Sequence, residues 1–308
     1  MILSTNPIKI VLAPTADLAA TVDAHVTVEA EYGSVVATGS VYTAAHHQPG
    51  MEALPAPCED VNIPVLEDGG TVLVSHLDLD TIGGCLRAMD SSLMEAFVYD
   101  SFWRLAGFVD VNGAHKLAQA NASEKDLARL YAFWAWKRAN VGQMSRDECT
   151  DVTDLIWDAE GALGLILDGS ASNDYGDATE LLAAGVQMRE EEAALNRSTL
   201  VETSSSVITR VTSFDPADGQ GFCNHLYTDT NGEPYAAVVT FAKCGGSITI
   251  SLADAIKGVS CREVMQEMFG PEAGGHDGIA GSPRNERMSL RSALNVASRL
   301  ESLINPEG

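Results

Sequence analysis

Basic residues, paired cysteines and long apolar runs are all scarce in this chain. Its 308 residues include 19 Lys and Arg against 43 Asp and Glu, which gives a formal net charge of −24. A surface of this charge repels a phosphate backbone, so we expect no broad binding to long nucleic acid unless basic residues cluster locally. The same charge raises the local concentration of cations.

The cysteines and the apolar runs exclude further classes. The six cysteines are scattered and form no C-x-x-C pair, which argues against a zinc knuckle or a disulfide framework. We expect reduced thiols and a cytoplasmic protein. No apolar run approaches the length of a membrane span, and the one near the start is too short for a secretory signal. We therefore expect no membrane partner.

Apolar runs and helical patterns predict the fold class α/β. Residues 8–12 and 72–74 are expected to form buried strands, and apolar residues at helical spacing between Leu127 and Trp134 indicate a core-facing helix. We predict a mixed or mostly parallel sheet flanked by helices over residues 1–175 and a linker helix over 176–200. A smaller α/β domain is predicted over 201–308, with an Asn231-Gly232 hairpin turn.

Three polar residues follow the strand predicted at 72–74. His76, Asp78 and Asp80 alternate with leucines, so an extended backbone would point all three to one side. One imidazole and two carboxylates form a ligand set that suits Mn²⁺ or Mg²⁺. A solvated turn with unrelated acids is the alternative.

Two further segments carry candidate site residues. The apolar run 105–109 predicts a short strand that ends in Asp110, followed by an Asn-Gly turn and His115. Loops after strands carry chemistry in open α/β sheets, although ordinary turn residues are the alternative. The adjacent His46 and His47 lie in a Pro/Gly loop, where plain surface residues are the alternative.

Four glycines within eight residues, from Gly274 to Gly281, allow the backbone to approach a ligand closely. Consecutive amides in such a loop can bind an anion, and His276 and Arg284 beside it have the charge to bind a phosphate. A simple tight turn is the alternative.

These motifs together resemble the DHH/DHHA1 phosphoesterases. Residues 247–252, a helix and the segment Gly274-Gly-His-Asp-Gly-Ile-Ala-Gly281 resemble the C-terminal substrate domain of that family. His76-x-Asp78-x-Asp80 looks like its first metal motif, and Ala45-His46-His47 is similar to its Asp-His-His stretch. Two departures are present: Ala45 replaces the aspartate, and the His-His stretch precedes the other motif. A circular permutation or a chance resemblance of this segment would each explain the order.

The resemblance implies a metal-dependent phosphoesterase with two Mn²⁺ or Mg²⁺ ions. It implies metal ligation by His46, His76, Asp78, Asp80 and Asp110. His47 would bind metal or donate to the phosphate, and His115 would orient a ligand or transfer a proton. Substrate would be held by Gly274, Gly275, His276, Gly278 and Arg284.

The charge balance favours a small phosphorylated substrate, such as a nucleotide or short oligonucleotide, over a long strand. A homodimer is left open. Two alternatives to the phosphoesterase remain: a catalytically silent relative that binds a nucleotide or a partner, and a metal-dependent hydrolase of a small molecule that is not a phosphoester.

Overall fold

A computed structural model describes most of the chain. The described residues are 8–48, 51, 53–67, 69–95, 98–142, 144–169, 172–173, 176–198, 200–212, 234–243 and 245–306. The chain divides into two compact units. The first comprises Met1–Glu31, Val35–Asp110 and Ala122–Val186, and the second comprises Tyr32–Ser34, Val111–Asn121 and Gln187–Gly308.

The first unit is built on a five-stranded sheet in the order β5-β2-β6-β1-β7. Its strands are β1 (Lys9–Leu12), β2 (Val26–Val28), β5 (Tyr42–Ala44), β6 (Thr71–Val74) and β7 (Thr150–Asp151). Strands β5, β2, β6 and β1 are parallel, and only β7 is antiparallel to its neighbour. The prediction of a mostly parallel N-terminal sheet is therefore confirmed.

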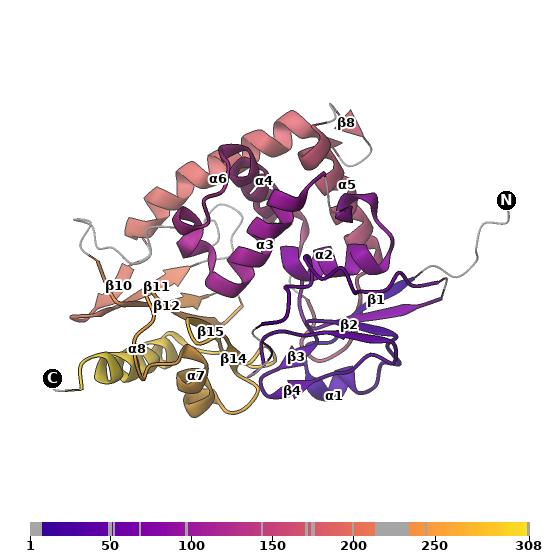
Figure 1. Cartoon of the computed structure of the whole chain (residues 1–308). Coiled ribbons are helices and arrows are strands. Elements are labelled where there is room, and N and C mark those ends of the chain that lie inside the picture. The colour runs from indigo at the N-terminus through magenta and orange to yellow at the C-terminus, as the bar shows by residue number, and fades with distance from the viewer. Residues whose placement is uncertain are drawn as a thin grey trace, which may run out of the picture. The chain divides into compact units, whose positions relative to one another are not determined.

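Helices flank this sheet, as Figure 1 shows with α2 and α5 above β1 and β2 and α1 below them. The helical segments of the first unit are α1 (Ala16–Ala19), α2 (Leu79–Ala88), η1 (Ser92–Met94), α3 (Asp100–Asn112), α4 (Glu124–Asn140) and α5 (Thr153–Asp168). The short η2 (Ala114–Gln119) belongs to the second unit, and α6 (Ala178–Ser198) begins in the first unit and ends in the second. Helix α6 occupies the stretch for which a linker helix was predicted. Two short ribbons pair β3 (Glu31–Tyr32) with β4 (Val35–Val36) and β8 (Ser172–Asn173) with β9 (Gly176–Asp177).

Burial of the central strands explains their apolar sequences. Ile10, Val26, Val28, Val72 and Val74 are fully buried. A parallel sheet with helices on its faces buries both sides of each strand, so its strands are continuous apolar runs rather than alternating ones. Each such side chain contributes on the order of 1.5–3 kcal/mol to folding. The apolar runs therefore both define and stabilise this sheet.

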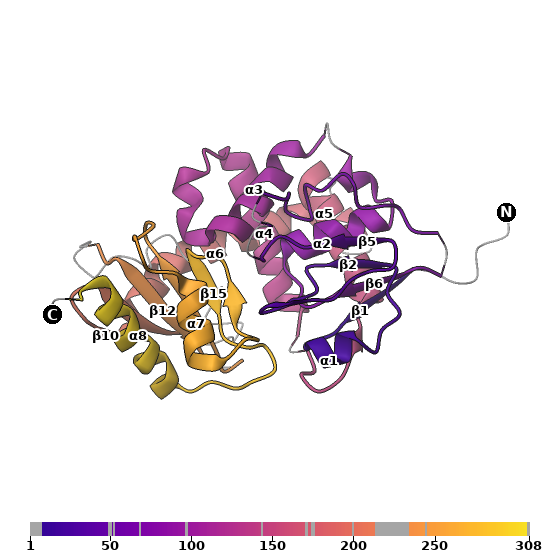
Figure 2. The ribbon, with the colours of Figure 1, turned by 60° about the horizontal axis from the view of Figure 1, so that its bottom comes forward.

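The second unit contains a six-stranded sheet in the order β10-β11-β12-β13-β15-β14. Its elements are β10 (Leu200–Thr203), β11 (Val207–Thr212), β12 (Ala237–Ala242), β13 (Ser247–Leu252), α7 (Cys261–Phe269), β14 (Gly274–Gly275), β15 (Ile279–Gly281) and α8 (Leu290–Ile304). Figure 2 shows α7 and α8 packed together over one face of this sheet. Buried residues of α8, such as Val296 and Leu300, share one core with Val207 and Val239 of the strands. The predicted Asn231-Gly232 turn lies outside the described residues.

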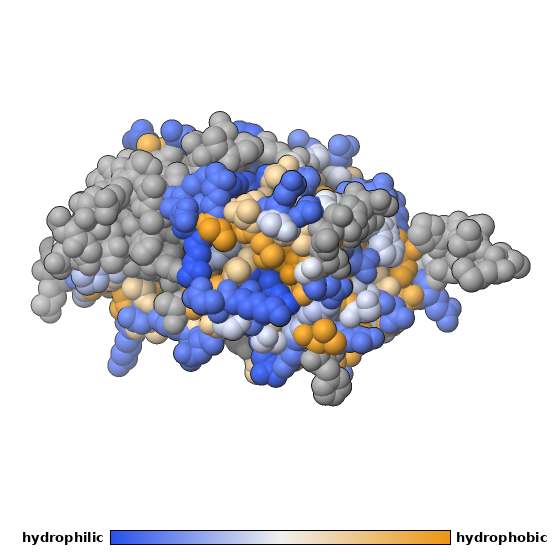
Figure 3. Space-filling view, turned by 90° about the horizontal axis from the view of Figure 1, so that it is seen from above, coloured by the Kyte–Doolittle hydropathy of each residue, from blue (hydrophilic) through white to orange (hydrophobic). Residues whose placement is uncertain are grey.

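None of the described helices combines the length and the hydrophobicity that a transmembrane span requires. Figure 3 shows hydrophobic residues exposed among hydrophilic ones on the face seen from above. Large exposed hydrophobic side chains include Val61, Val98 and Trp157.

Candidate metal centre

Three neighbouring parallel strands end together at one edge of the first sheet. The registers of β5-β2 and β2-β6 pair Val28 with both Ala44 and Val74, the last residues of the flanking strands. Segments that follow the carboxyl ends of such strands form the usual binding edge of an α/β sheet. Residues distant in sequence therefore converge there.

Glu29, directly after β2, lies at the centre of this convergence. Its side chain is fully buried, and its Oε1 lies 2.6 Å from Nε2 of His46 and 2.8 Å from Nε2 of His47. Its other oxygen, Oε2, lies 3.3 Å from Nε2 of His76 and accepts a hydrogen bond from Thr81 Oγ1 at 2.9 Å. One carboxylate thus faces histidines from two separate loops.

The register also places Glu29 beside position 45. The backbone amide of Glu29 donates to the carbonyl of Ala44 at 2.9 Å, and Ala45 is buried. Glu29 therefore presents its carboxylate next to Ala45, the residue that precedes the two histidines.

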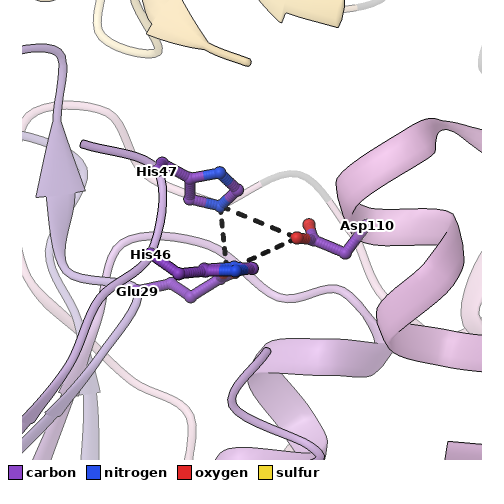
Figure 4. Close-up of side chains that lie close together, drawn as sticks. All are labelled: Glu29, His46, His47 and Asp110. Carbon is purple, nitrogen blue, oxygen red and sulfur yellow. Dashed lines mark hydrogen bonds and ion pairs between the residues drawn. The ribbon is translucent and has the colours of Figure 1, made fainter. Parts of the chain in front are cut away.

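Asp110 reaches the same histidines from a helix, not from a strand end. Its Oδ2 lies 3.1 Å from Nε2 of His46 and 4.0 Å from Nε2 of His47, and Figure 4 shows the carboxylate pointing at both rings. The prediction of a strand over 105–109 is wrong, because these residues belong to α3. The buried residues Phe102, Trp103 and Ala106 recur at helical spacing, which gives α3 one apolar face.

The extended backbone predicted through His76, Asp78 and Asp80 is also wrong. Asp78 is the N-cap of α2, and its Oδ1 accepts from the amide of Thr81 at 2.8 Å. Aspartate is a favoured N-cap because it satisfies an amide that the helix leaves unpaired. Asp78 Oδ2 still lies 3.0 Å from Nε2 of His76, whereas Asp80 sits in the first helical turn. A helix start, not strand periodicity, arranges these residues.

Asp80 supplies a test of whether the cluster fits a cation. Its carboxylate is buried, and Oδ1 accepts from the amide of Cys58 at 2.9 Å. Within the described residues, Oδ2 is buried without a hydrogen-bond partner and lies 3.9 Å from Nε2 of His46. Burial and the charges of Glu29 and Asp110 raise the pKa of Asp80 well above its usual value. A buried carboxylate oxygen of this kind is what a bound cation would satisfy.

The histidines already concentrate positive charge in this cluster. Burial alone would lower the pKa of His46, but hydrogen bonds with Asp110 and Glu29 raise it to about 11. Burial would also lower the pKa of His47, but the charges of Glu29 and Asp110 raise it to about 9. Burial would raise the pKa of Glu29, yet the charge of His47 and hydrogen bonds with both histidines hold it well below its usual value. Protons thus occupy imidazoles that face carboxylates, where a divalent ion would compete with them.

The donor atoms form two groups that share Glu29. One group is Glu29, His46, His47 and Asp110, and the other is Glu29, His76 and Asp78. Within each group the nitrogen and oxygen atoms lie within 4.8 Å of one another. Imidazole nitrogen mixed with carboxylate oxygen suits Mn²⁺ and related ions better than thiol-seeking metals. The donor set therefore fits divalent cations.

The glycine-rich segment forms an antiparallel ribbon in the second unit. Gly275 has φ +138°, and a Cβ added there would lie 2.6 Å from the carbonyl oxygen of Ile279, so strand pairing itself requires glycine. His276 is buried and Arg284 is exposed. Gly278 lines a cavity of about 360 Å³ in the same unit. A role in substrate binding for Gly274, Gly275, His276, Gly278 and Arg284 stays a prediction.

The structure brings together six of the seven residues that the sequence analysis assigned to metal binding or catalysis. These are His46, His47, His76, Asp78, Asp80 and Asp110. The seventh is His115, whose side chain lies outside the described part of the chain. The sequence analysis does not identify Glu29, although a strand-forming segment, Val26-Thr27-Val28, followed by an acid is close to the pattern that singles out Asp110.

Comparisons with known proteins give distant structural likeness only. No protein-family model matches this sequence, and no curated protein matches it. Among solved structures, a pGpG-specific phosphodiesterase, PggH from Vibrio cholerae, is similar at 10% identity and a TM-score of 0.43, over 92% of this chain and 100% of that chain. An uncharacterized protein from Helicobacter pylori G27 is similar at 9% identity and a TM-score of 0.20, over 79% of this chain and 77% of that one. Neither likeness is strong enough to bear on function.

Proposed function

We propose that this chain is a metal-dependent phosphoesterase that hydrolyses a small phosphoester, such as a nucleotide or a short oligonucleotide phosphodiester. The observation that carries the proposal is the shared position of Glu29, whose two oxygens face two groups of histidine and carboxylate donors. The resemblance of the His76-x-Asp78-x-Asp80 segment to a phosphoesterase metal motif supports the same reaction class.

Two divalent ions held by these groups would activate a water molecule and neutralise charge on the phosphoryl oxygens. His46, His47 and Asp110 would hold one ion, His76 and Asp78 the other, and Glu29 would contact both. Asp80 would complete the buried group through its Oδ2 atom. Thr81 would fix the orientation of Glu29 through the hydrogen bond to Oε2.

Exposure indicates from which side a substrate would approach. The side chains of His46 and Glu29 are 2% and 0% exposed, whereas those of His76 and Asp78 are 24% and 33% exposed. A phosphoester would therefore meet the His76 and Asp78 group first. Burial lowers the pKa of Lys137 in α4, and the charge of Asp78 opposes this effect, so a lysine acts electrostatically on the Asp78 side of the cluster. Such a cation suits an anionic substrate.

The net charge of −24 limits the substrate's size. A long strand would extend over an acidic surface, whereas a small phosphoester needs only the cluster and a few nearby cations. We therefore assign mononucleotides, dinucleotides or similar small phosphoesters to this site.

Hydrolysis assays on metal-stripped protein with and without added Mn²⁺ test this function. Bis-p-nitrophenyl phosphate and linear dinucleotides should be cleaved only with the metal, and p-nitrophenyl acetate should not be cleaved. Glu29→Gln should lose the activity, while Glu67→Gln, an exposed glutamate of the same unit, should keep it. Mn²⁺ uptake without phosphodiester cleavage would indicate a silent binding protein, and metal-dependent cleavage of the acetate alone would indicate a hydrolase of another class.

A further inference from the structure

Glu31 contacts the histidine loop from a second direction. Its Oε2 accepts from the backbone amide of His46 at 3.1 Å, and its two oxygens accept from the amide of His47 at 3.2 and 3.3 Å. The side-chain amide of Gln48 donates to Glu31 Oε1 at 3.1 Å. One carboxylate thus binds three consecutive residues of the loop that follows β5.

Glu29 and Glu31 divide the contacts of this loop between them. Glu29 faces the imidazoles of His46 and His47, whereas Glu31 faces their backbone amides. Glu31 is buried, with only 6% of the residue exposed. Several hydrogen bonds from one buried side chain therefore restrict the backbone of the loop that carries both imidazoles.

We propose that Glu31 is a positioning residue that sets the metal affinity of one of the two donor groups. It orients His46 and His47 without offering an oxygen to the ion itself. The second group takes His76 and Asp78 from the segment after β6, a different loop from the one whose amides Glu31 binds. This inference rests on the proposed function, because it presumes that the cluster binds two ions.

Replacement of Glu31 should therefore affect one ion and spare the other. In Glu31→Gln, a carboxamide NH₂ replaces one acceptor oxygen and faces backbone donors. Partners that orient a metal ligand in this way typically change metal affinity by about 10–100-fold. We expect a loss of that size at one Mn²⁺ site and an unchanged affinity at the other.

Calorimetric titration of the full chain with Mn²⁺ measures the two affinities separately. Glu31→Gln and Glu31→Asp are compared with wild type and with Glu67→Gln, which should match wild type. Glu31→Asp keeps the charge but is too short to reach all three donors, so its loss should be intermediate. If Glu31→Gln does not fold, the titration of Glu31→Asp still tests the positioning role.

The outcomes separate this inference from the proposed function. An equal loss at both sites would indicate a general effect on folding and would overturn the positioning role. Two wild-type affinities in Glu31→Gln and Glu31→Asp would also overturn it while leaving the proposed function intact. Wild-type protein that binds no Mn²⁺ would overturn the proposed function and this inference together.

Discussion

Nε2 of His46 lies 2.6 Å from Oε1 of Glu29, although 17 residues separate the two in the chain. Parallel pairing of β2 with β5 creates this contact, because it aligns the carboxyl ends of the two strands. The contact places the imidazole of His46 against the carboxylate of Glu29, which also faces His76 in a second loop.

Glu29→Ala should remove the binding of both ions. The change deletes the only carboxylate common to the two donor groups found among the described residues. Because charge stabilisation by bound metal is worth several kcal/mol, activity should fall by about 100-fold or more. Mn²⁺ titration and the phosphodiester assay measure the two effects.

A second substitution makes this prediction specific. Ala45 lies beside Glu29 across the β2-β5 pair, so Ala45→Asp in the Glu29→Ala background should restore part of the metal binding. Ala45→Asp alone adds a carboxylate to an already acidic buried cluster, and it should destabilise the metal-free protein by about 1–3 kcal/mol. If the double variant binds no more metal than Glu29→Ala alone, an aspartate at position 45 does not take the place of Glu29, and this prediction is contradicted.

Asp78 combines a structural and a ligand role, which two substitutions separate. Asn is as good an N-cap as Asp, so Asp78→Asn should keep the stability of α2 and lose Mn²⁺ affinity. Asp78→Ala should lose the same affinity and about 1 kcal/mol of unfolding free energy as well. Chemical denaturation of the metal-free proteins gives the stability difference. Unchanged Mn²⁺ binding in Asp78→Asn would exclude Asp78 as a ligand.

The histidine pKa values predict that protons leave when metal binds. His46 and His47 have pKa values of about 11 and about 9 in the metal-free fold, so both are protonated near pH 7.5. Metal requires neutral imidazoles, so binding should release about two protons from these histidines, and affinity should rise with pH toward 9. Calorimetry in buffers of different ionisation enthalpy counts these protons. Release of none would contradict the ligand role of both histidines.

The same pKa values fix how the metal-free protein responds to pH. In the folded protein both pKa values lie above the unfolded value of about 6.5. The protonated imidazoles therefore contribute their full stabilisation to the fold below about pH 6.5. This contribution is lost as pH rises through about 9 and then about 11. Unfolding free energy of the metal-free protein should therefore decrease across this window.

The glycine ribbon of the second unit provides a prediction about stability. Gly275→Ala introduces a Cβ at a positive φ and 2.6 Å from the carbonyl oxygen of Ile279, so it should cost about 1–3 kcal/mol. Gly278→Ala meets no atom within 4 Å and should be close to neutral. Denaturation curves compare the two. Equal stability of both variants would contradict the close approach of β14 and β15.

Much of the fold could be predicted from the sequence, because buried parallel strands and capped helices leave local signals. The strands predicted at 8–12 and 72–74 and the helix that carries Leu127 and Trp134 follow from such patterns, and the structure has β1, β6 and α4 there. The run 105–109 was assigned wrongly because five apolar residues fit a buried strand and a buried helix equally well. The alternation through Asp80 was read as a strand because a five-residue pattern does not show that Asp78 caps a helix.

The site was predictable only in part for a different reason. His76, Asp78 and Asp80 lie within five residues, and Asp110 and the paired histidines were found from short motifs. The role of Glu29 depends on the sheet order β5-β2-β6, in which strands that are not consecutive in the chain become neighbours. A single sequence does not specify that order, so the acid after β2 could not be linked to the histidines after β5 and β6.

Anomalous scattering at the manganese edge, from crystals grown with Mn²⁺, tests the shared role of Glu29 most directly. The account predicts two peaks, one beside Glu29, His46, His47 and Asp110 and one beside Glu29, His76 and Asp78. Both peaks should be absent from crystals of Glu29→Ala grown under the same conditions. Wild-type crystals without a peak at Glu29, or with manganese bound only elsewhere, would contradict it.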